Sequence, residues 1–83
     1  MYKVYVLYSE SYDKIYIGFT SDLEQRLLSH NFLSQKGWTV RYRPWRLLHT
    51  ESFTTKEEAL KREKELKGAQ GRLWIREMLH TKK

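Results

Sequence analysis

The run Lys3-Val4-Tyr5-Val6-Leu7 is followed, after a polar segment, by the run Ile15-Tyr16-Ile17-Gly18. Both runs are rich in β-branched and aromatic residues, which are enriched in β-strands. Residues 9–14, between the two runs, are of the types that form turns. The sequence therefore predicts that the two runs pair as a β-hairpin.

Two tyrosines make this hairpin chemically informative. With a turn centred near Glu10 and Ser11, Tyr5 and Tyr16 lie opposite each other across the strand pair. Opposed residues project from the same face of a sheet. Two phenols are therefore expected on one surface, although aromatic residues on a half-buried strand are also commonly part of a core.

The residues after the hairpin predict a helix and a third strand. Ser21 or Asp22 can cap a helix that continues to His30. Residues 35–38 are expected to form a loop. A further strand is expected over residues 45–53, because Pro44 before it suits the start of a strand.

The second half of the chain predicts two more helices. Thr55 and Glu58 match the Ser/Thr-x-x-Glu capping box, and the helix that they open should run to Lys67 and stop at Gly68. Gly71 precedes a last amphipathic segment. The predicted order is β-β-α-β-α-α, and a small sheet covered by helices belongs to the α+β or α/β class.

Size and charge narrow the function classes. The 83 residues, 1–83, are expected to form a single domain. Sixteen Lys and Arg against ten Asp and Glu give a net charge of +6, which favours nucleic acid as a partner, with an anionic membrane surface second. The alternative is that the charge has no such role, because many small soluble proteins are basic without binding a polyanion.

Cysteine content and hydropathy indicate the expected cellular compartment of the protein. Cysteine is absent, which excludes disulfides and thiolate metal sites and is compatible with a reducing cytoplasm. No apolar run reaches membrane-spanning length, and the first residues lack a signal-peptide core. A cytoplasmic protein without a membrane segment is therefore expected, with fraying confined to residues 81–83.

Glu63 is the acid with the most unusual position. Ala59 and Leu66 mark the inward side of the second predicted helix, and Glu63 projects between them. A carboxylate on an inward face is usually paired or coordinates a cation. Mg²⁺ commonly takes one or two carboxylates and completes its shell with water and phosphate oxygens. The alternative is a salt bridge to Arg26 or to a neighbouring lysine.

Arg26 and His30 are candidates for phosphate contacts. The guanidinium of Arg26 offers a planar fork of donors that matches phosphate oxygens. His30, one turn later, can donate to a phosphate or relay a proton. A solvated arginine and a core histidine are the alternatives for these two positions.

Basic and aromatic residues alternate in the middle of the chain. Guanidiniums can meet phosphates there while rings offer stacking surfaces. Gly18, at the end of the second strand, lets a backbone or a ligand approach closely. The candidate nucleic-acid contacts are thus Gly18, Arg41, Arg43, Trp45 and Arg46. The alternative is a loop whose tryptophans complete the core.

These segments together resemble the GIY-YIG nuclease superfamily, in particular its small single-domain members related to the nuclease domain of the excision-repair C subunit. Tyr16-Ile17-Gly18 is an intact Tyr-Ile-Gly, and Lys3-Val4-Tyr5 stands where the family has Gly-Ile-Tyr. The run from Tyr16 to His30 is similar to the signature Tyr-Ile-Gly-x-Thr-x-Asp-Leu-x-x-Arg-Leu-x-x-His. Residues 58–63 resemble the helix that bears the family's metal-binding glutamate.

The resemblance implies a three-stranded antiparallel sheet flanked by helices and the hydrolysis of a DNA phosphodiester with Mg²⁺ or Mn²⁺. It implies that Glu63 holds the metal, that Tyr5 is the leading candidate for the base, and that Arg26 stabilises phosphoryl charge. Tyr16 and His30 would position the phosphate or assist proton transfer. The implied setting is repair, recombination or defence.

The chain also departs from the family pattern in two places. Phe19 stands where several members have a lysine, and no asparagine matches the one near the end of many members. A non-catalytic nucleic-acid-binding module that keeps the nuclease fold is therefore the alternative, and a protein-interaction domain is a third. Specificity would come from a homodimer or from an accessory protein.

Overall fold

A three-stranded antiparallel sheet forms the middle of the molecule. The computed structural model describes residues 1–33, 35 and 37–81. β1 (Tyr2–Ser9) pairs with both β2 (Lys14–Thr20) and β3 (Arg46–Phe53), so the sheet order is β2-β1-β3 and β1 is central. The third strand thus begins one residue later than predicted. β2 and β3 are the edges of the sheet.

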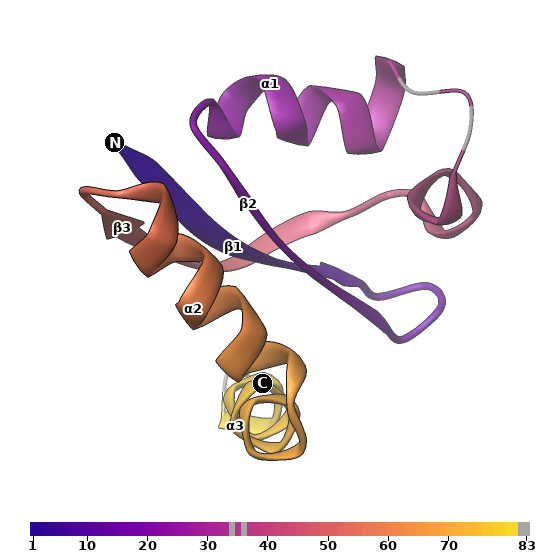
Figure 1. Cartoon of the computed structure of the whole chain (residues 1–83). Helices are drawn as coiled ribbons and strands as arrows, with labels where there is room; N and C mark the ends of the chain where they lie inside the picture. Colours follow the sequence, from indigo (N-terminus) through magenta and orange to yellow (C-terminus); the bar gives the residue numbers. More distant parts are fainter. Residues whose placement is uncertain (34, 36, 82–83) are drawn as a thin grey trace.

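Helices cover both faces of the sheet, as Figure 1 shows, with α1 on one side and α2 and α3 on the other. The helical elements are α1 (Leu23–Leu28), a π-helical turn (Ser29–Leu33), a 3₁₀ helix (Trp38–Tyr42), α2 (Lys56–Lys67) and α3 (Ala69–Thr81). The predicted α+β class and the order β-β-α-β-α-α are confirmed.

The predicted loop over residues 35–38 is right for Gln35 and Gly37, whereas Trp38 begins the 3₁₀ helix. Lys36 lies outside the described residues, as do Lys82 and Lys83, on which the expected fraying falls.

The central strand is buried on both faces. Val4, Tyr5, Val6 and Leu7 of β1 each have 0% exposure. The two valines pack in a core cluster that includes residues of α2 and α3, whereas the other two belong to a second cluster on the side of α1. Because side chains alternate along a strand, β1 joins two cores through one sheet.

The register of the hairpin differs from the prediction. Tyr5 pairs with Gly18, and Tyr16 pairs with Leu7, so the two tyrosines are diagonal neighbours and not opposite each other. The turn is centred one residue later than predicted, because Asp13 adopts a left-handed conformation (φ 52°) that aspartate tolerates. A shift of two residues in pairing keeps every side chain on its face. The expected sharing of one surface therefore still holds.

The predicted helix starts are largely right. Asp22, one of the two candidates, caps α1 by accepting a hydrogen bond from the backbone N–H of Gln25 at 3.2 Å. α2 has the reciprocal capping box of Thr55 and Glu58 and ends before Gly68 as predicted. Among the described residues, no helix is both long enough and apolar enough to cross a bilayer.

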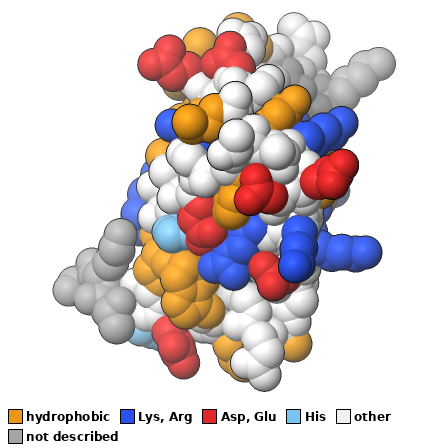
Figure 2. Space-filling model, turned by 60° about the vertical axis from the view of Figure 1, so that its left-hand side comes forward, with side chains coloured by type: hydrophobic (Ala, Val, Ile, Leu, Met, Phe, Trp, Pro, Cys, Tyr) orange, Lys and Arg blue, Asp and Glu red, His pale blue; other side chains and the backbone are white. Residues whose placement is uncertain are grey.

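Figure 2 shows one face of the molecule, where basic and acidic side chains lie interspersed beside hydrophobic ones. The net charge of +6 therefore does not form a uniform basic patch on this face.

The last helix begins earlier than predicted. α3 starts at Ala69 and includes Gly71, which the sequence suggests lies before the helix. A Cβ atom added at Gly71 would collide with the backbone of Leu66 in α2. Gly71 is thus needed for the close approach of α2 and α3 and not for breaking the helix.

We expect Gly71→Ala to destabilise the protein by about 1–3 kcal/mol, because the added methyl group has no room between the two helices. The sign of the change in unfolding free energy is informative, because alanine in a helix interior otherwise stabilises a protein by about 1 kcal/mol relative to glycine. The measurement is urea unfolding followed by circular dichroism. Gly68→Ala is the control, because its Cβ would meet the Glu65 carbonyl oxygen at 3.4 Å. A stabilised Gly71→Ala variant would contradict this packing.

Candidate active site

Two phenols and an imidazole gather on the α1 side of the sheet. The Tyr5 hydroxyl lies 3.0 Å from His30 Nε2. The ring centroids of Tyr5 and Tyr16 are 6.1 Å apart, and those of Tyr16 and His30 are 4.7 Å apart. Arg26 of α1 is close enough to the Tyr5 hydroxyl to interact with it. The structure thus brings together four of the five predicted catalytic residues.

His30 is positioned by the π-helical turn that follows α1. This turn carries His30 to a buried position with 6% exposure. Arg43 holds the turn from outside, donating from Nε to the His30 carbonyl oxygen at 2.6 Å and from Nη2 to that of Ser29 at 3.0 Å. Single π-helical turns are frequent at functional sites.

The absent side chain of Gly18 makes room for Tyr5. A Cβ atom at Gly18 would lie 2.7 Å from the Tyr5 hydroxyl oxygen and 3.1 Å from the Tyr16 ring. The group that approaches Gly18 closely is therefore a phenol from the neighbouring strand. The expectation that this glycine leaves space for a nucleic acid is corrected in this respect, because Tyr5 fills the space.

Burial sets the protonation states of the cluster. Burial raises the pKa of Tyr5 to about 12, against a smaller lowering by Arg26. Burial also lowers the pKa of His30 from its usual 6.5, assisted by the positive charges of Arg26 and Arg43. At neutral pH the phenol is protonated and the imidazole is neutral, so either group can be the donor in their hydrogen bond, depending on which nitrogen of His30 carries the proton.

A hollow of about 320 Å³ opens beside this cluster. Its wall is made of Tyr16, Arg26, Ser29, His30, Gly37, Trp38 and Thr39. Arg26 is exposed and Trp38 is half-exposed, so a donor fork and an aromatic face both border the opening. Tyr5 is fully buried and does not line it, so Tyr5 can act only through neighbours such as His30 and Arg26 or after a local movement.

Glu63 lies in the other layer. It is on α2, which packs against the face of the sheet opposite to Tyr5. Its side chain is 16% exposed, and its carboxylate is 3.6 Å from Lys67 Nζ. This is the pairing with a neighbouring lysine that the sequence suggests as the alternative. Among the described contacts, none joins Glu63 to the tyrosines.

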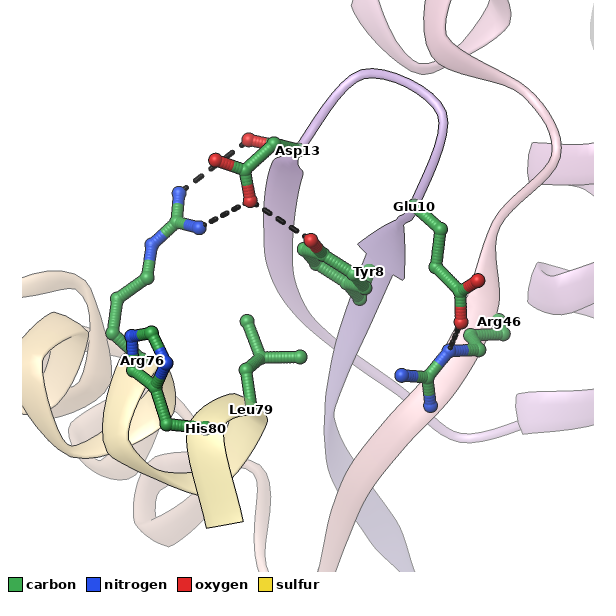
Figure 3. Close-up of a pocket in the computed structure, with 7 residues that line it drawn as sticks. All are labelled: Tyr8, Glu10, Asp13, Arg46, Arg76, Leu79 and His80. Atoms are coloured by element: carbon green, nitrogen blue, oxygen red, sulfur yellow. Dashed lines mark hydrogen bonds and ion pairs between the residues drawn. The ribbon is translucent and has the colours of Figure 1, made fainter. Parts of the chain in front are cut away.

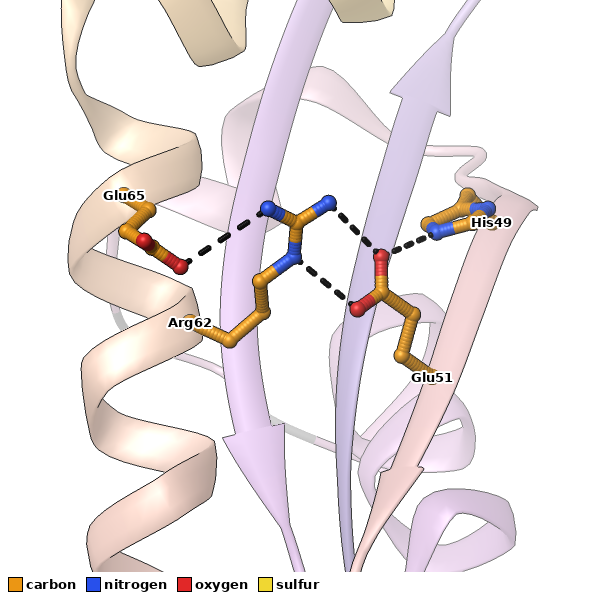
Figure 4. A network of polar contacts seen from close by, with 4 residues as sticks. All are labelled: His49, Glu51, Arg62 and Glu65. Carbon is orange, nitrogen blue, oxygen red and sulfur yellow. Dashed lines mark hydrogen bonds and ion pairs between the residues drawn. The ribbon is translucent and has the colours of Figure 1, made fainter.

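A polar network fixes the rotation of α2, as Figure 4 shows. Arg62 donates to both carboxylate oxygens of Glu51 on β3, from Nε at 2.9 Å and from Nη2 at 3.0 Å. Successive residues of a helix are about 100° apart. Ala59 and Leu66 mark the inward side of α2, and Arg62 and Glu63 lie on opposite sides of it. Because Arg62 points towards β3, Glu63 lies on the flank of α2 towards β2, which is one of the two edge strands.

The donor set limits how a metal ion could be held. Within the described part of the chain, no three carboxylate or imidazole groups cluster closely enough to hold an ion by themselves. Glu63 supplies a single carboxylate. Such a set fits Mg²⁺, which often uses one or two carboxylates and completes its octahedron with water and substrate phosphates.

The basic and aromatic segment is only partly a surface. Trp45 is 4% exposed and donates from its indole N–H to the Thr39 carbonyl oxygen at 2.7 Å, so it completes the core instead of offering a stacking face. Arg43 supports the π-helical turn. Arg41 and Arg46 are exposed, and Arg46 is paired with Glu10 through its Nε.

One residue of this region has no clear sequence signal. Asn31 donates to the Trp45 carbonyl oxygen at 2.9 Å and accepts from the Trp45 backbone N–H at 2.6 Å. It thereby joins the π-helical turn to the chain entering β3. The side chain of Asn31 makes the two hydrogen bonds that a neighbouring strand would otherwise make. A single residue in this role produces no periodic pattern in the sequence.

The fold and the cluster define a small α+β domain with the arrangement of a GIY-YIG catalytic domain, and the model of that domain matches residues 1–76. The chain belongs to the GIY-YIG family, and hence to a superfamily of nucleases. The resemblance seen in the sequence is thereby confirmed.

Relatives of the chain carry the name UPF0213 protein. One from Halobacterium salinarum is 39% identical over 67 residues, which cover 81% of this chain and 86% of that protein. One from Staphylococcus saprophyticus is 43% identical over 53 residues, 64% of this chain. The match spans 65% of the length of the Staphylococcus protein. These names specify no activity.

We expect Gly18→Ala to displace the Tyr5 ring and to break its hydrogen bond to His30, because the new Cβ would lie 2.7 Å from the hydroxyl oxygen. The fully buried ring has little freedom to move, so a loss of about 1–3 kcal/mol in unfolding free energy should accompany the change. Thermal unfolding and the aromatic NMR signals of Tyr5 measure both effects. Gly37→Ala tests a glycine with positive φ but open space. Unchanged Tyr5 signals in Gly18→Ala would contradict the tight contact.

We expect stability to fall with acid in a range set by His30. Its folded-state pKa is lower than 6.5, so the unfolded chain takes up a proton that the folded protein resists. Stability is therefore full above pH 6.5 and declines as the pH falls from 6.5 towards the lowered pKa. Urea midpoints between pH 7.5 and 5.5 measure the slope, and His30→Gln should flatten it. An equal slope in His30→Gln would refute this assignment.

Proposed function

We propose that the chain is a metal-dependent DNA endonuclease that hydrolyses phosphodiester bonds in repair, recombination or defence. The observation that carries the proposal is the open hollow where Tyr16, Arg26 and His30 meet, in a chain of the GIY-YIG family. A net charge of +6 supports a polyanionic substrate. The absence of cysteine is compatible with action in the cytoplasm.

Arg26 and Tyr16 are assigned to the phosphate. The exposed guanidinium of Arg26 presents paired N–H donors to the phosphoryl oxygens, where negative charge grows during displacement. Tyr16 borders the same hollow and can donate its hydroxyl proton to a phosphate oxygen. Both groups act by holding the scissile phosphate in one orientation.

Tyr5 and His30 together are assigned the role of removing a proton from the attacking water. His30 lines the hollow and is neutral at pH 7, and in the tautomer that carries its proton on Nε2 the unprotonated Nδ1 can accept a proton there. Tyr5, behind it, holds the ring through the 3.0 Å hydrogen bond. A pKa of about 12 keeps the phenol protonated, so in this role Tyr5 orients the imidazole instead of serving as a free phenolate.

Glu63 is assigned to Mg²⁺ or Mn²⁺ at the edge of β2. A bound ion of this kind neutralises charge on the scissile phosphate and its leaving oxygen. The position of Glu63 on the flank of α2 towards β2 supports a substrate strand that passes along this free edge, with the tyrosine cluster on one side and the carboxylate on the other.

A non-catalytic nucleic-acid-binding module is the second candidate, and two observations favour it. Tyr5 has no exposed surface, and Phe19 occupies the place where related nucleases have a lysine that could lower the pKa of a phenol. Such a protein would bind DNA through its basic surface without cleaving it.

We expect Glu63→Gln and Tyr5→Phe each to reduce cleavage of supercoiled DNA in Mn²⁺ by at least about 100-fold, the usual scale for loss of an acid–base or charge-stabilising group. DNA affinity, measured in EDTA, should change little. Glu57→Gln and Tyr2→Phe are the matched controls, since the first is an exposed acid of α2 and the second lies in the other core cluster.

The two candidate functions give different results in this experiment. Cleavage that survives Glu63→Gln would remove the assignment of the metal to this carboxylate. Salt-sensitive binding with no cleavage in any divalent metal would establish the binding module in place of the nuclease.

A further inference from the structure

A second hollow lies on the other face of the sheet, between the β1–β2 turn and the end of α3 (Figure 3). Its volume is about 750 Å³, more than twice that of the hollow at Tyr16. It is lined by Tyr8, Glu10, Asp13, Arg46, Arg76, Leu79 and His80. Five of these seven side chains carry or can carry charge, so this hollow suits a polar ligand.

Each arginine of this hollow is held by a carboxylate of the same turn. Arg76 donates from Nη1 to Asp13 Oδ1 at 2.6 Å and from Nη2 to the Asp13 carbonyl oxygen at 3.4 Å. Arg46 donates from Nε to Glu10 Oε1, and its terminal nitrogens point away from Glu10 in Figure 3. The two carboxylates thus occupy places that anionic oxygens of a ligand could take.

In these two ion pairs, a ligand can replace the carboxylate as the partner of the arginine. The side chains of the two arginines are 41–47% exposed, and those of the two acids are 66–67% exposed. Exposed ion pairs contribute only about 0–1 kcal/mol each. A ligand that offers phosphate oxygens can therefore replace Glu10 and Asp13 at little cost.

The backbone of the turn is adapted to this pairing. Asp13 has a φ of 52°, a left-handed conformation that glycine adopts more easily. In this conformation its carboxylate accepts from Arg76 and from the Tyr8 hydroxyl, the latter at 2.9 Å. The hydrogen bonds from Arg76 and Tyr8 lower the pKa of Asp13, so it is ionised whenever the hollow is empty at neutral pH.

A smaller hollow adjoins the second hollow on the side of the segment that enters β3. It has a volume of about 230 Å³, shares Tyr8, Glu10 and Arg46 with the second hollow and is also lined by Trp45. Trp45 in turn contacts Trp38, with ring centroids 5.7 Å apart, and Trp38 borders the hollow that holds Arg26.

We propose that the hollow between the hairpin turn and α3 is a second phosphate-binding site, where Arg46 and Arg76, with His80, take backbone phosphates of a nucleic-acid strand whose scissile bond lies at the first hollow. Glu10 and Asp13 hold the two arginines in place until the strand displaces them. The identity of the ligand as a nucleic-acid strand rests on the proposed function. The geometry of the site does not depend on that function.

The test measures binding in EDTA, where cleavage is absent, with a short DNA duplex and the full chain. Arg46→Gln combined with Arg76→Gln should weaken binding by about tenfold or more and reduce the salt slope, log K against log salt, by about 2, since each phosphate contact contributes about 0.9. The charge-matched control is Lys61→Gln combined with Lys64→Gln, two exposed positions of α2. Equal losses in the two double variants would overturn the site.

A second pair of variants tests the same site by removing negative charge, so that DNA binding is expected to tighten instead of weaken. Glu10→Gln combined with Asp13→Asn should tighten DNA binding more than Glu57→Gln combined with Glu77→Gln, which changes the net charge equally at exposed positions. Asparagine keeps the tolerance of position 13 for positive φ. Equal tightening would mean that only net charge matters, and the site would be rejected.

The ring signals of His80 in NMR distinguish the source of the phosphate. Duplex DNA should shift them at protein-equivalent concentration, whereas inorganic phosphate should not at the same concentration of phosphate groups. A shift with inorganic phosphate and none with DNA would overturn the assignment to a strand. Binding at this hollow together with no cleavage in any metal would reject the nuclease proposal and leave the second site intact.

Discussion

The structure depends on a central strand that is buried on both faces. β1 directs Val4 and Val6 into one core and Tyr5 and Leu7 into the other, and all four are fully buried. A hydroxyl in such a place needs a hydrogen-bond partner. The Tyr5 hydroxyl finds it in His30, so one hydrogen bond ties the middle of the sheet to the turn that carries the histidine. Arg43 fixes the same turn from outside, which leaves the wall of the neighbouring hollow few ways to rearrange.

Much of the fold can be predicted from the sequence because its signals are local. The hairpin follows from strand-forming residues around a turn, and α2 follows from the capping box at Thr55. The pairing register is less predictable, since it depends on the left-handed conformation of Asp13. Alternation nevertheless keeps Tyr5 and Tyr16 on one face in both registers. The start of α3 is missed because Gly71 looks like a helix breaker, whereas its role is to let two helices touch.

The candidate site is less predictable, because its parts meet through tertiary packing. Spacing along α1 places Arg26 and His30 near the sheet, but the π-helical turn that buries His30 has no sequence signal comparable to a cap. Burial also decides which aromatic rings are accessible, and it removes Trp45 from the surface while leaving Trp38 at an opening. The sequence identifies the inward side of α2, but it does not say which face of the sheet α2 covers. Glu63 and the tyrosines consequently belong to opposite layers of the fold.

The three tryptophans of the chain have different surroundings, and this gives the protein a built-in optical reporter. Trp45 is shielded and adjacent to Trp38, Trp38 is 46% exposed beside the hollow, and Trp74 packs edge-on against His49 in the other layer. Indole emission shifts with the polarity around the ring. A ligand entering the hollow would therefore change the fluorescence of Trp38 first, while the shielded Trp45 would report on the intactness of the core on the α1 side.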